Sequence, residues 1–349
     1  MNPAALSGEI KALALELGFV RVGFAEASAL PEDAARLQAW LAAEHHGQMA
    51  YMAETAGVRS DPRHPDMMPS ARSVIVLATA YSRAAALPPL PGGGRIARYA
   101  QGRDYHPVLY DRLRAIKRKL RDAGATARAC VDSMPILERA WAVRAGLGFI
   151  GKNACLIVPG VGSHVLLSAV LTSAELVSDT PMRERCGNCR LCLDACPTRA
   201  FKAPRTLDAR RCIAYLTIEH EGAIDSELRE GVGDWIFGCD VCQDVCPYNR
   251  TEQPQPIAAD PHAPRDRLRE LGTEDFLRMD EAVFDRYTRG TALRRAGREG
   301  MARNAALALG NGRDKRHLPL LEQVASRDPS EVVREAASWA RDRLTRSDD

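Results

Sequence analysis

The sequence lacks the features that would place it in or across a membrane. No apolar run approaches the ~20 residues that a membrane-spanning helix needs. The N-terminal stretch contains Glu9 and Glu16 among its apolar residues and has no basic start, so it does not resemble a secretory signal peptide. We therefore expect a cytoplasmic protein that does not bind membranes.

A strong charge bias is missing as well. The 349 residues have a formal net charge of only +3, and 46% of them are hydrophobic, which is typical of an ordinary globular protein. The net charge therefore identifies no binding partner. At ~100–200 residues per domain, the length predicts two or three domains.

What the chain does have is cysteine, ten in all. Without an export signal these thiols are expected to stay reduced, which favours metal binding or redox chemistry over disulfides. Eight of them lie between Cys186 and Cys246. The first four follow the spacing C-x2-C-x2-C-x3-C-P, which is that of bacterial ferredoxins with [4Fe–4S] clusters; they are Cys186, Cys189, Cys192 and Cys196.

A second run, C-x2-C-x3-C-P, has one cysteine fewer, and Cys212 is the only candidate to replace it between the two runs. Eight ligands suffice for two cubanes. Crosswise ligation, as in two-cluster ferredoxins, would divide them into two sets. The first set is Cys186, Cys189, Cys192 and Cys246, and the second is Cys196, Cys212, Cys239 and Cys242.

A pair of structural zinc sites is the alternative, because they also use C-x2-C pairs. We favour iron–sulfur clusters, since zinc ribbons need neither the third cysteine of the first run nor the Cys-Pro ends. The other two cysteines, Cys130 and Cys155, lie in or beside apolar runs and are expected to be buried structural thiols.

The first 175 residues alternate between helical and strand-like patterns, which predicts a mixed or mostly parallel α/β domain. The predicted helices cover 4–17, 32–44, 105–123 and 135–145, and the predicted strands cover 73–80, 126–131, 156–158 and 165–171.

A metal-dependent domain is expected at 176–255, where the eight cysteines lie. The proline-rich stretch 252–264 is predicted to be a linker. Beyond it, 265–349 is helical, and three short helices at 302–311, 317–325 and 331–344 resemble a helical repeat. An ordinary helical domain fits that pattern equally well.

A candidate chemical site is Asp132, between the strand predicted at 126–131 and the helix predicted at 135–145. Ligands of α/β proteins often bind near the carboxyl ends of strands. Asp132 could donate a proton if desolvation raised its pKa. The residues alone favour a simpler role, in which Asp132 or Ser133 caps the following helix.

Two further motifs are weak. Gly146, Gly148 and Gly151 fit G-x-G-x-x-G, but they follow a helix instead of a strand, so they are no dinucleotide fingerprint. They would allow close approach of a large flat or phosphorylated ligand. Asp104 and His106 match part of a D-x-H-x-x-G cobalt-binding signature whose glycine is missing, so we assign His106 to the start of a helix.

Several ordered blocks together resemble the epoxyqueuosine reductase family, cobalamin and iron–sulfur enzymes of the last step of queuosine synthesis in tRNA. The blocks include RSDPRHPDMMPSARSVIVLA at 59–78, ARYAQGRDYHPVL at 97–109, VDSMPILERAWAVRAGLGFIGKN at 131–153 and GCDVCQDVCPYN at 238–249.

The resemblance implies a nitroreductase-like α/β domain over 1–175 that binds base-off cobalamin, a ferredoxin-like domain with two [4Fe–4S] clusters over 176–255 and a HEAT-like helical domain over 265–349. Electrons from an external low-potential donor would pass through the clusters to give Co(I). The epoxide of the wobble base would then open, with Asp132 as the proton donor. A monomer is compatible with so large a substrate.

Further residues are implied in the same way. Corrin contacts would come from Arg59, Arg98, Tyr99, Asp132, Lys152, Asn153 and Ser163. The segment 285–303 carries six arginines against two acidic residues, which suits phosphate contact, although a solvated helix face is the alternative. Given the resemblance, we expect tRNA contacts from Arg289, Arg294, Arg295, Arg298 and Arg303.

Two rival functions remain. A reductive dehalogenase-like cobalamin enzyme would share the cofactors and act on small molecules. A non-enzymatic ferredoxin-type electron carrier fused to an RNA-binding module would need no cobalamin.

Overall fold

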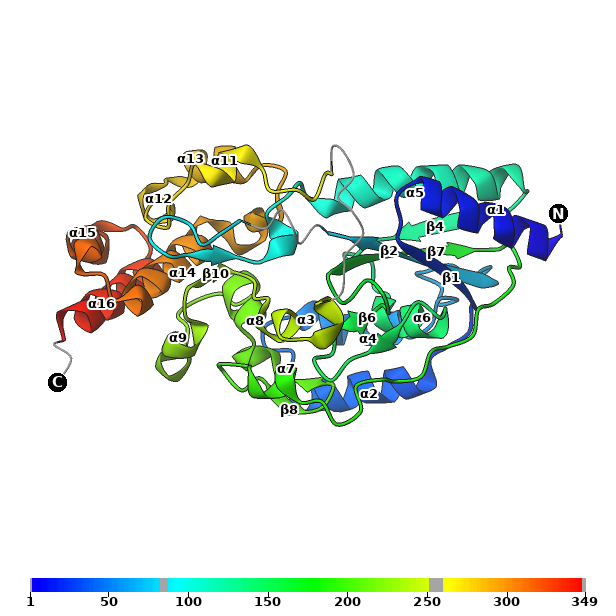
Figure 1. The fold of residues 1–349 in the computed structure, drawn as a ribbon, viewed down its shortest axis with the longest axis horizontal. Helices are drawn as coiled ribbons and strands as arrows, with labels where there is room; N and C mark the ends of the chain where they lie inside the picture. Colours follow the sequence, from blue (N-terminus) through cyan, green and yellow to red (C-terminus); the bar gives the residue numbers. More distant parts are fainter. Residues whose placement is uncertain (1, 82–86, 251–259, 347–349) are drawn as a thin grey trace.

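The computed structural model describes residues 2–81, 87–250 and 260–346. Figure 1 shows an elongated molecule with the N-terminal sheet and its helices at one end and the C-terminal helices at the other. Most of the predicted linker, 251–259, lies outside the described residues. None of the helices in the described ranges is both long and apolar enough to cross a bilayer.

A four-stranded sheet forms the centre of the N-terminal half. Its order is β1-β2-β7-β4, and all three neighbouring pairs are antiparallel. The expectation of a mixed or mostly parallel sheet is therefore wrong for this sheet. Apolar runs buried on both faces are typical of parallel strands, but here helices cover both faces of an antiparallel sheet. The strands are β1 (Arg21–Glu26), β2 (Ser73–Ala80), β4 (Ala127–Cys130) and β7 (Val165–Thr172).

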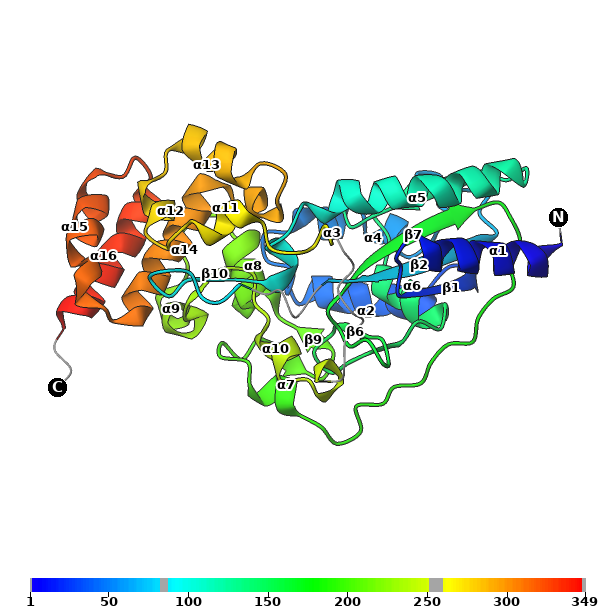
Figure 2. The same cartoon turned by 45° about the horizontal axis from the view of Figure 1, so that its top comes forward.

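The helices α1 (Pro3–Glu16) and α5 (Tyr105–Asp122) cover one face of this sheet, as Figures 1 and 2 show. The α5 helix forms because apolar residues recur every three or four positions, and these side chains are fully buried. Its N-cap is Asp104, whose carboxylate accepts a hydrogen bond from the His106 backbone. The buried face consists of Leu109, Leu113, Ile116 and Leu120.

The other face packs against α6 (Glu138–Arg144) through Trp141 and Ala142. This helix is shorter than the one predicted at 135–145. Nearby elements complete this side of the domain: α2 (Pro31–Ala42), α3 (Ala50–Glu54), α4 (Ala56–Arg59), β5 (Phe149–Ile150) and β6 (Leu156–Ile157).

Short elements make up the cysteine-rich region, which is consistent with folding that depends on metal. They are α7 (Leu191–Asp194), β8 (Phe201–Ala203), β9 (Thr206–Leu207), η2 (Ala209–Arg211), α8 (Ile213–Ile218), α9 (Ser226–Val232), β10 (Trp235–Phe237), α10 (Val241–Asp244) and η3 (Pro247–Asn249).

The C-terminal region is helical, as expected. Its longest members, α14 (Gly297–Gly312) and α16 (Glu331–Thr345), pack closely because small residues face each other: a Cβ added at Gly310 would lie 2.8 Å from the Cβ of Ala340. The others are α11 (Asp266–Arg269), α12 (Asp275–Arg278), α13 (Glu281–Thr288), η4 (Ala292–Ala296), η5 (Lys315–His317) and α15 (Leu318–Arg327).

The hydrophobic cores do not follow the divisions expected at 175 and 255–265. One core combines residues of 90–100, 209–237 and 268–344. The segment 90–100 thus leaves the N-terminal sheet and packs with the C-terminal helices. It includes β3 (Arg95–Ile96), which pairs in parallel with β10, and η1 (Arg98–Ala100).

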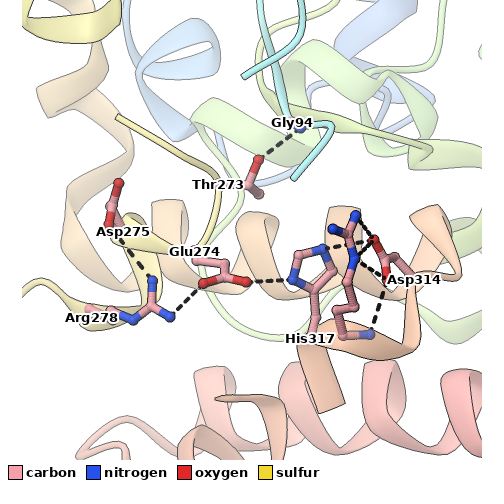
Figure 3. A network of polar contacts seen from close by, with 8 residues as sticks. Gly94, Thr273, Glu274, Asp275, Arg278, Asp314 and His317 are labelled. Carbon is pink, nitrogen blue, oxygen red and sulfur yellow. Dashed lines mark hydrogen bonds and ion pairs between the residues drawn. The ribbon is translucent and has the colours of Figure 1, made fainter. Parts of the chain in front are cut away.

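The triglycine turn that leads into β3 is anchored to the helical region. Gly94 donates its backbone N–H to Thr273 Oγ1 at 2.8 Å, as Figure 3 shows, and Thr273 donates its own N–H to Pro91 O. Beside it, the Glu274 carboxylate pairs with Arg278 and with His317, each at 2.5 Å. The turn at 92–94 is therefore tied to the helical region.

Candidate active site and cluster domain

The candidate active site lies at one edge of the central sheet. Because β2 and β4 run opposite to β7, the end of β2 lies opposite the start of β7, where Ala80 pairs with Val165, and β4 ends opposite Ala169 on the same strand. Tyr81 follows β2, Asp132 follows β4, and His164 precedes β7; the Tyr81 N–H donates to His164 O. The first turn of α5 adds Tyr105 and His106.

Asp132 is held by two side chains of α5. Its Oδ2 accepts a hydrogen bond from the Tyr105 hydroxyl at 2.6 Å and lies 3.2 Å from His106 Nε2. The backbone at Asp132 has φ of 44°, a left-handed conformation that is uncommon for residues other than glycine and often marks a functional position. The helix-cap interpretation is wrong for Asp132, because α6 begins only at Glu138 after Leu137.

The His106 ring lies between two carboxylates. Its Nδ1 is 2.8 Å from Asp104 Oδ1, and its Nε2 faces Asp132, so neither ring nitrogen is left to bind cobalt. Asp104 and then Asp132 raise the pKa of His106 to about 9. The hydrogen bond from His106 in turn lowers the pKa of Asp132, although partial desolvation of this exposed carboxylate acts in the opposite direction. Asp132 is thus a carboxylate at neutral pH in this arrangement, and its role as proton donor stays a prediction.

Tyr99 connects Asp132 with the cluster domain. Its ring lies edge-on to Tyr105, with centroids 6.1 Å apart, and 6.3 Å from Phe237, two residues before Cys239. Burial, followed by the charge of Asp132, raises the pKa of Tyr99, so its hydroxyl stays protonated. Because β3 pairs with β10, η1 is fixed between the two parts of the site.

Arg98, next to Tyr99, binds the second cysteine loop directly. Its backbone N–H donates to Asp240 Oδ2 at 2.8 Å, and its guanidinium lies 3.1 Å from Asp244 Oδ1. Burial raises the pKa of Asp240 to about 6. Arg98 therefore secures the loop that carries Cys239 and Cys242.

The first expected set of cysteines is brought together. Burial, followed by the charges of Cys246, Cys186 and Cys189, raises the pKa of Cys192 to about 11. The buried thiol of Cys246 packs with Phe149 and Ile157. Crosswise ligation of this set stays a prediction, and the structure places its four members as neighbours.

The second expected set is also assembled. Burial raises the pKa of Cys239, and the nearby Cys212 and Cys196 add to this shift. Cys242 has Cys239 and Cys212 among its neighbours. In the described part of the chain, no three His, Cys, Asp or Glu side chains are close enough to hold a single metal ion. A [4Fe–4S] cluster requires no such group, because each iron takes one cysteine.

The two remaining cysteines differ. Cys130 is fully buried in the sheet core, as expected. Cys155 instead interacts with the thiol of Cys242, which lowers the pKa of Cys155 and raises that of Cys242. Its position beside the second set could not be seen in a pattern of apolar residues.

Three residues expected at the corrin join the α/β domain to the cysteine loops. Lys152 Nζ donates to Gly187 O at 2.6 Å and to Cys189 O at 2.9 Å. Asn153 Nδ2 donates to Cys242 O at 3.3 Å. Ser163 Oγ donates to Gln243 Oε1 at 3.0 Å, and its N–H donates to Asn249. These bonds position both loops, whereas contact with a corrin stays a prediction.

The glycines of the G-x-G-x-x-G match make close contacts inside the protein. A Cβ at Gly148 would lie 2.0 Å from Ile157 O, and one at Gly146 would lie 2.6 Å from Thr180 O. At Gly151 it would lie 2.6 Å from Ile157 Cδ1. The requirement for glycine is therefore explained by packing and not by ligand approach.

Arg59, at the end of α4, donates to Thr55 Oγ1 at 2.8 Å and lies over the Tyr51 ring. Burial raises the pKa of Tyr51, while the charge of Arg59 lowers it slightly. Both Asp132 and Arg295 act electrostatically on Tyr51. Arg59 therefore lies in the same charged surroundings as Asp132.

The C-terminal arginines fall into two groups. Arg298 and Arg303 are buried, with 8% and 2% of their surface exposed. Arg298 binds Asp328 and Met279 O, and Arg303 donates to the carbonyls of Leu216, His220 and Gly222. The expected RNA contact is wrong for these two, because burial and internal partners occupy their guanidinium groups.

The other three arginines are exposed. Arg289 and Arg294 both pair with Asp285, at 2.6 and 2.7 Å, and Arg295 pairs with Glu219. Exposed pairs of this kind exchange readily with other anions. Their contact with RNA stays a prediction.

Apolar side chains at the end of β2, at the start of β7 and in the loop after β4 remain partly exposed. Ala80, Met134, Val165 and Leu167 pack on the core without being fully covered. A corrin ring has apolar faces and polar amides at its rim, so these residues together with Tyr99 and Asp132 suit it chemically. The residues present are therefore compatible with bound cobalamin.

Comparisons with known proteins agree with this arrangement. The family model described as a 4Fe-4S double cluster binding domain matches 185–249, so the chain carries such a domain. The model described as Epoxyqueuosine reductase QueG matches 59–133.

Curated relatives extend the match to nearly the whole chain. The epoxyqueuosine reductase of Pseudomonas aeruginosa is 42% identical over 348 residues, covering 97% of this chain and 94% of the relative. That of Escherichia coli is 39% identical, covering 96% and 88%.

Solved structures give the same result. An epoxyqueuosine reductase crystallised with an epoxyqueuosine-modified tRNA-Tyr stem loop superposes with a TM-score of 0.85 at 29% identity, covering 97% of this chain and 90% of the other. That of Streptococcus thermophilus gives 0.83 at 30% identity, covering 98% and 90%. By sequence and by fold, this chain belongs to the epoxyqueuosine reductase family.

Proposed function

We propose that this protein reduces epoxyqueuosine to queuosine at the wobble position of tRNA, as the names of its relatives indicate. The observation that carries the proposal is the connection from Asp132 through Tyr105, Tyr99 and Phe237 to the loop of Cys239. Asp132, which can transfer protons, thus lies close to the cysteine-rich domain, whose clusters would deliver electrons.

Cobalamin would be held at the sheet edge by the partly exposed apolar residues, with Tyr99 and Asp132 at its border. When reduced to Co(I), this cofactor supplies a strong nucleophile or reductant. The two [4Fe–4S] clusters would receive electrons from an external low-potential donor. One chain supplies both Asp132 and all eight cysteines, so we propose a monomer that acts in the cytoplasm on its tRNA.

Asp132 would move a proton at the epoxide oxygen, since an epoxide opens more easily when its oxygen is protonated. The Oδ2 atom of Asp132 already contacts the Tyr105 hydroxyl and His106 Nε2. Among the described residues no hydrogen bond to Oδ1 is found, which leaves this oxygen for the substrate. Tyr99 and Tyr105 would exclude water from one side of the carboxylate.

The basic helix that starts beside Asp132 supports an RNA substrate. The α5 helix carries six basic and two acidic residues, an excess of four, although the whole chain has a net charge of only +3. Arg114, Lys117 and Arg118 are exposed on this helix, which begins at the residues that bind Asp132. We propose that this face and the exposed arginines of η4 contact the phosphates.

Anaerobic reconstitution followed by reaction with epoxyqueuosine-containing tRNA tests the proposal. About eight irons and one corrinoid per chain are expected, with conversion to queuosine seen by mass spectrometry of the nucleosides. Zinc in place of iron, or unchanged epoxyqueuosine, contradicts it. Iron–sulfur clusters without corrinoid uptake would favour a ferredoxin-type carrier, and dehalogenation of small organohalides alone would favour a dehalogenase.

A further inference from the structure

The proposed reaction, on which this inference rests, needs more protons than Asp132 can hold. Converting an epoxide to an alkene removes the oxygen as water and consumes two electrons and two protons. The electrons come from the low-potential donor through the clusters. A single carboxyl group holds one proton, and Asp132 is ionised at rest because of its contact with His106.

The geometry supplies a neighbour that can hold the other proton. His106 Nε2 lies 3.2 Å from Asp132 Oδ2, within reach for proton transfer. The opposite ring nitrogen, Nδ1, is 2.8 Å from Asp104 Oδ1. Asp104 is itself fixed as the N-cap of α5, so it sets the orientation of the ring.

We propose that His106, oriented by Asp104, reloads Asp132 with protons during the reaction. The first proton passes from His106 to Asp132 and on to the epoxide oxygen as the first carbon–oxygen bond breaks. His106 takes another proton from solvent, since 32% of its side chain is exposed. The second proton follows the same path as the remaining carbon–oxygen bond breaks and water leaves.

Tyr105 is a positioning residue in this scheme. Its hydroxyl donates to the same Oδ2 of Asp132, and its ring stacks on His106 with centroids 4.2 Å apart. Burial and the charge of Asp132 raise the pKa of Tyr105, so its hydroxyl does not compete as an acid. It therefore fixes the distance between His106 and Asp132.

Other charged groups also face this pair, and one of them is a rival. Arg295 of η4 acts on Asp132, and Arg59 of α4 acts on Glu138 and Tyr51. Glu138, at the start of α6, has its pKa raised to about 7 by burial and interacts electrostatically with Asp132. The rival is a second proton from Glu138, although no hydrogen bond between Glu138 and Asp132 is found among the described residues.

The test compares His106→Gln and Asp104→Asn with Glu138→Gln as the matched control. We expect His106→Gln to lower kcat ~10²-fold or more, with KM for the tRNA stem loop and corrinoid content unchanged. His106→Ala should regain turnover when imidazole is added, which a purely structural role would not produce. Wild-type kcat with His106→Gln, or the large loss in Glu138→Gln instead, would overturn the proposal.

A second readout needs no turnover. Histidine NMR of the wild type should show His106 titrating near pH 9 and at lower pH in Asp104→Asn and in Asp132→Asn. A His106 pKa near its ordinary ~6.5 in the wild type would refute the proposed interaction of His106 with Asp104 and Asp132, even if the enzyme were active. Conversely, a wild-type enzyme that converts no epoxyqueuosine refutes the proposed function. The titration of His106 would still show whether the ring interacts with Asp104 and Asp132.

Discussion

The hydroxyl of Tyr105 donates to Asp132 Oδ2 at 2.6 Å, although 27 residues separate the two. The bond joins the first turn of α5 to the loop after β4, where the backbone of Asp132 is left-handed. A helix terminus thus holds a carboxylate whose side chain is still 61% exposed. The position of Asp132 depends on residues outside its own loop.

Asp132→Asn keeps the size and the acceptor oxygen of the side chain but cannot deliver a proton. We expect kcat to fall ~10²–10⁴-fold, as for loss of a general acid, while iron and corrinoid contents stay at wild-type levels. Nucleoside mass spectrometry under single-turnover conditions measures this. Asp66→Asn, an exposed substitution, serves as the control. A fully active Asp132→Asn enzyme would remove Asp132 from the chemistry.

The pH dependence of stability should reveal His106. Its folded pKa of about 9 exceeds the unfolded value of ~6.5, so protonation of His106 stabilises the fold fully below pH ~6.5. This contribution is lost as the pH rises through about 9. The wild-type Tm should therefore fall relative to that of His106→Gln between these values. Parallel Tm curves would contradict the raised pKa.

Cys212 should belong to one cluster only. Cys212→Ala is expected to reduce the iron content from about eight to about four per chain, because only one cubane loses a ligand. Iron analysis and EPR of the reduced protein measure the change. Cys130→Ala, a buried thiol away from both sets, should keep all the iron. Full iron content in Cys212→Ala would show that another residue completes the cluster.

Arg298 should matter for folding instead of RNA binding. Arg298→Ala leaves the buried Asp328 unpaired, which is expected to destabilise the protein by ~3–5 kcal/mol. Thermal or urea unfolding measures the loss. Replacing both partners, as in Arg298→Met with Asp328→Leu, should recover most of it. A stable Arg298→Ala variant with weakened RNA binding would restore the original expectation.

The basic face of α5 should contribute to RNA affinity. Replacing Arg114, Lys117 and Arg118 by Gln should weaken stem-loop binding and reduce the slope of log K against log salt by roughly 2. Fluorescence anisotropy at several salt concentrations measures both. The control, Arg36→Gln, removes an exposed charge on α2. Unchanged affinity in the triple variant would place the RNA elsewhere.

The double-cluster domain and most elements of regular structure could be predicted from the sequence, because spacing and apolar periodicity are local properties. The sequence predicts a strand at 73–80, and β2 is observed over the same residues. Strand pairing could not be predicted, since a run buried on both faces looks alike in parallel and antiparallel sheets.

The site residues that were missed depend on tertiary contacts. The sequence predicts that Tyr105 and His106 start a helix, and they do. Their contact with Asp132 depends on the fold, because that residue lies on another loop. Arg298 and Arg303 lie in a segment whose composition is typical of RNA binding. Their burial comes from Asp328 and from the carbonyls at the end of α8, which lie far away in the sequence.

The pairing of β3 with β10 affects the order in which the protein can be completed during synthesis. Arg95 lies opposite Trp235, so η1 cannot reach its final position until about 140 further residues have left the ribosome. By then Cys186, Cys189, Cys192, Cys196 and Cys212 are already available for metal. The surface around Tyr99 can therefore be completed only after most of the cysteine-rich region has been synthesised.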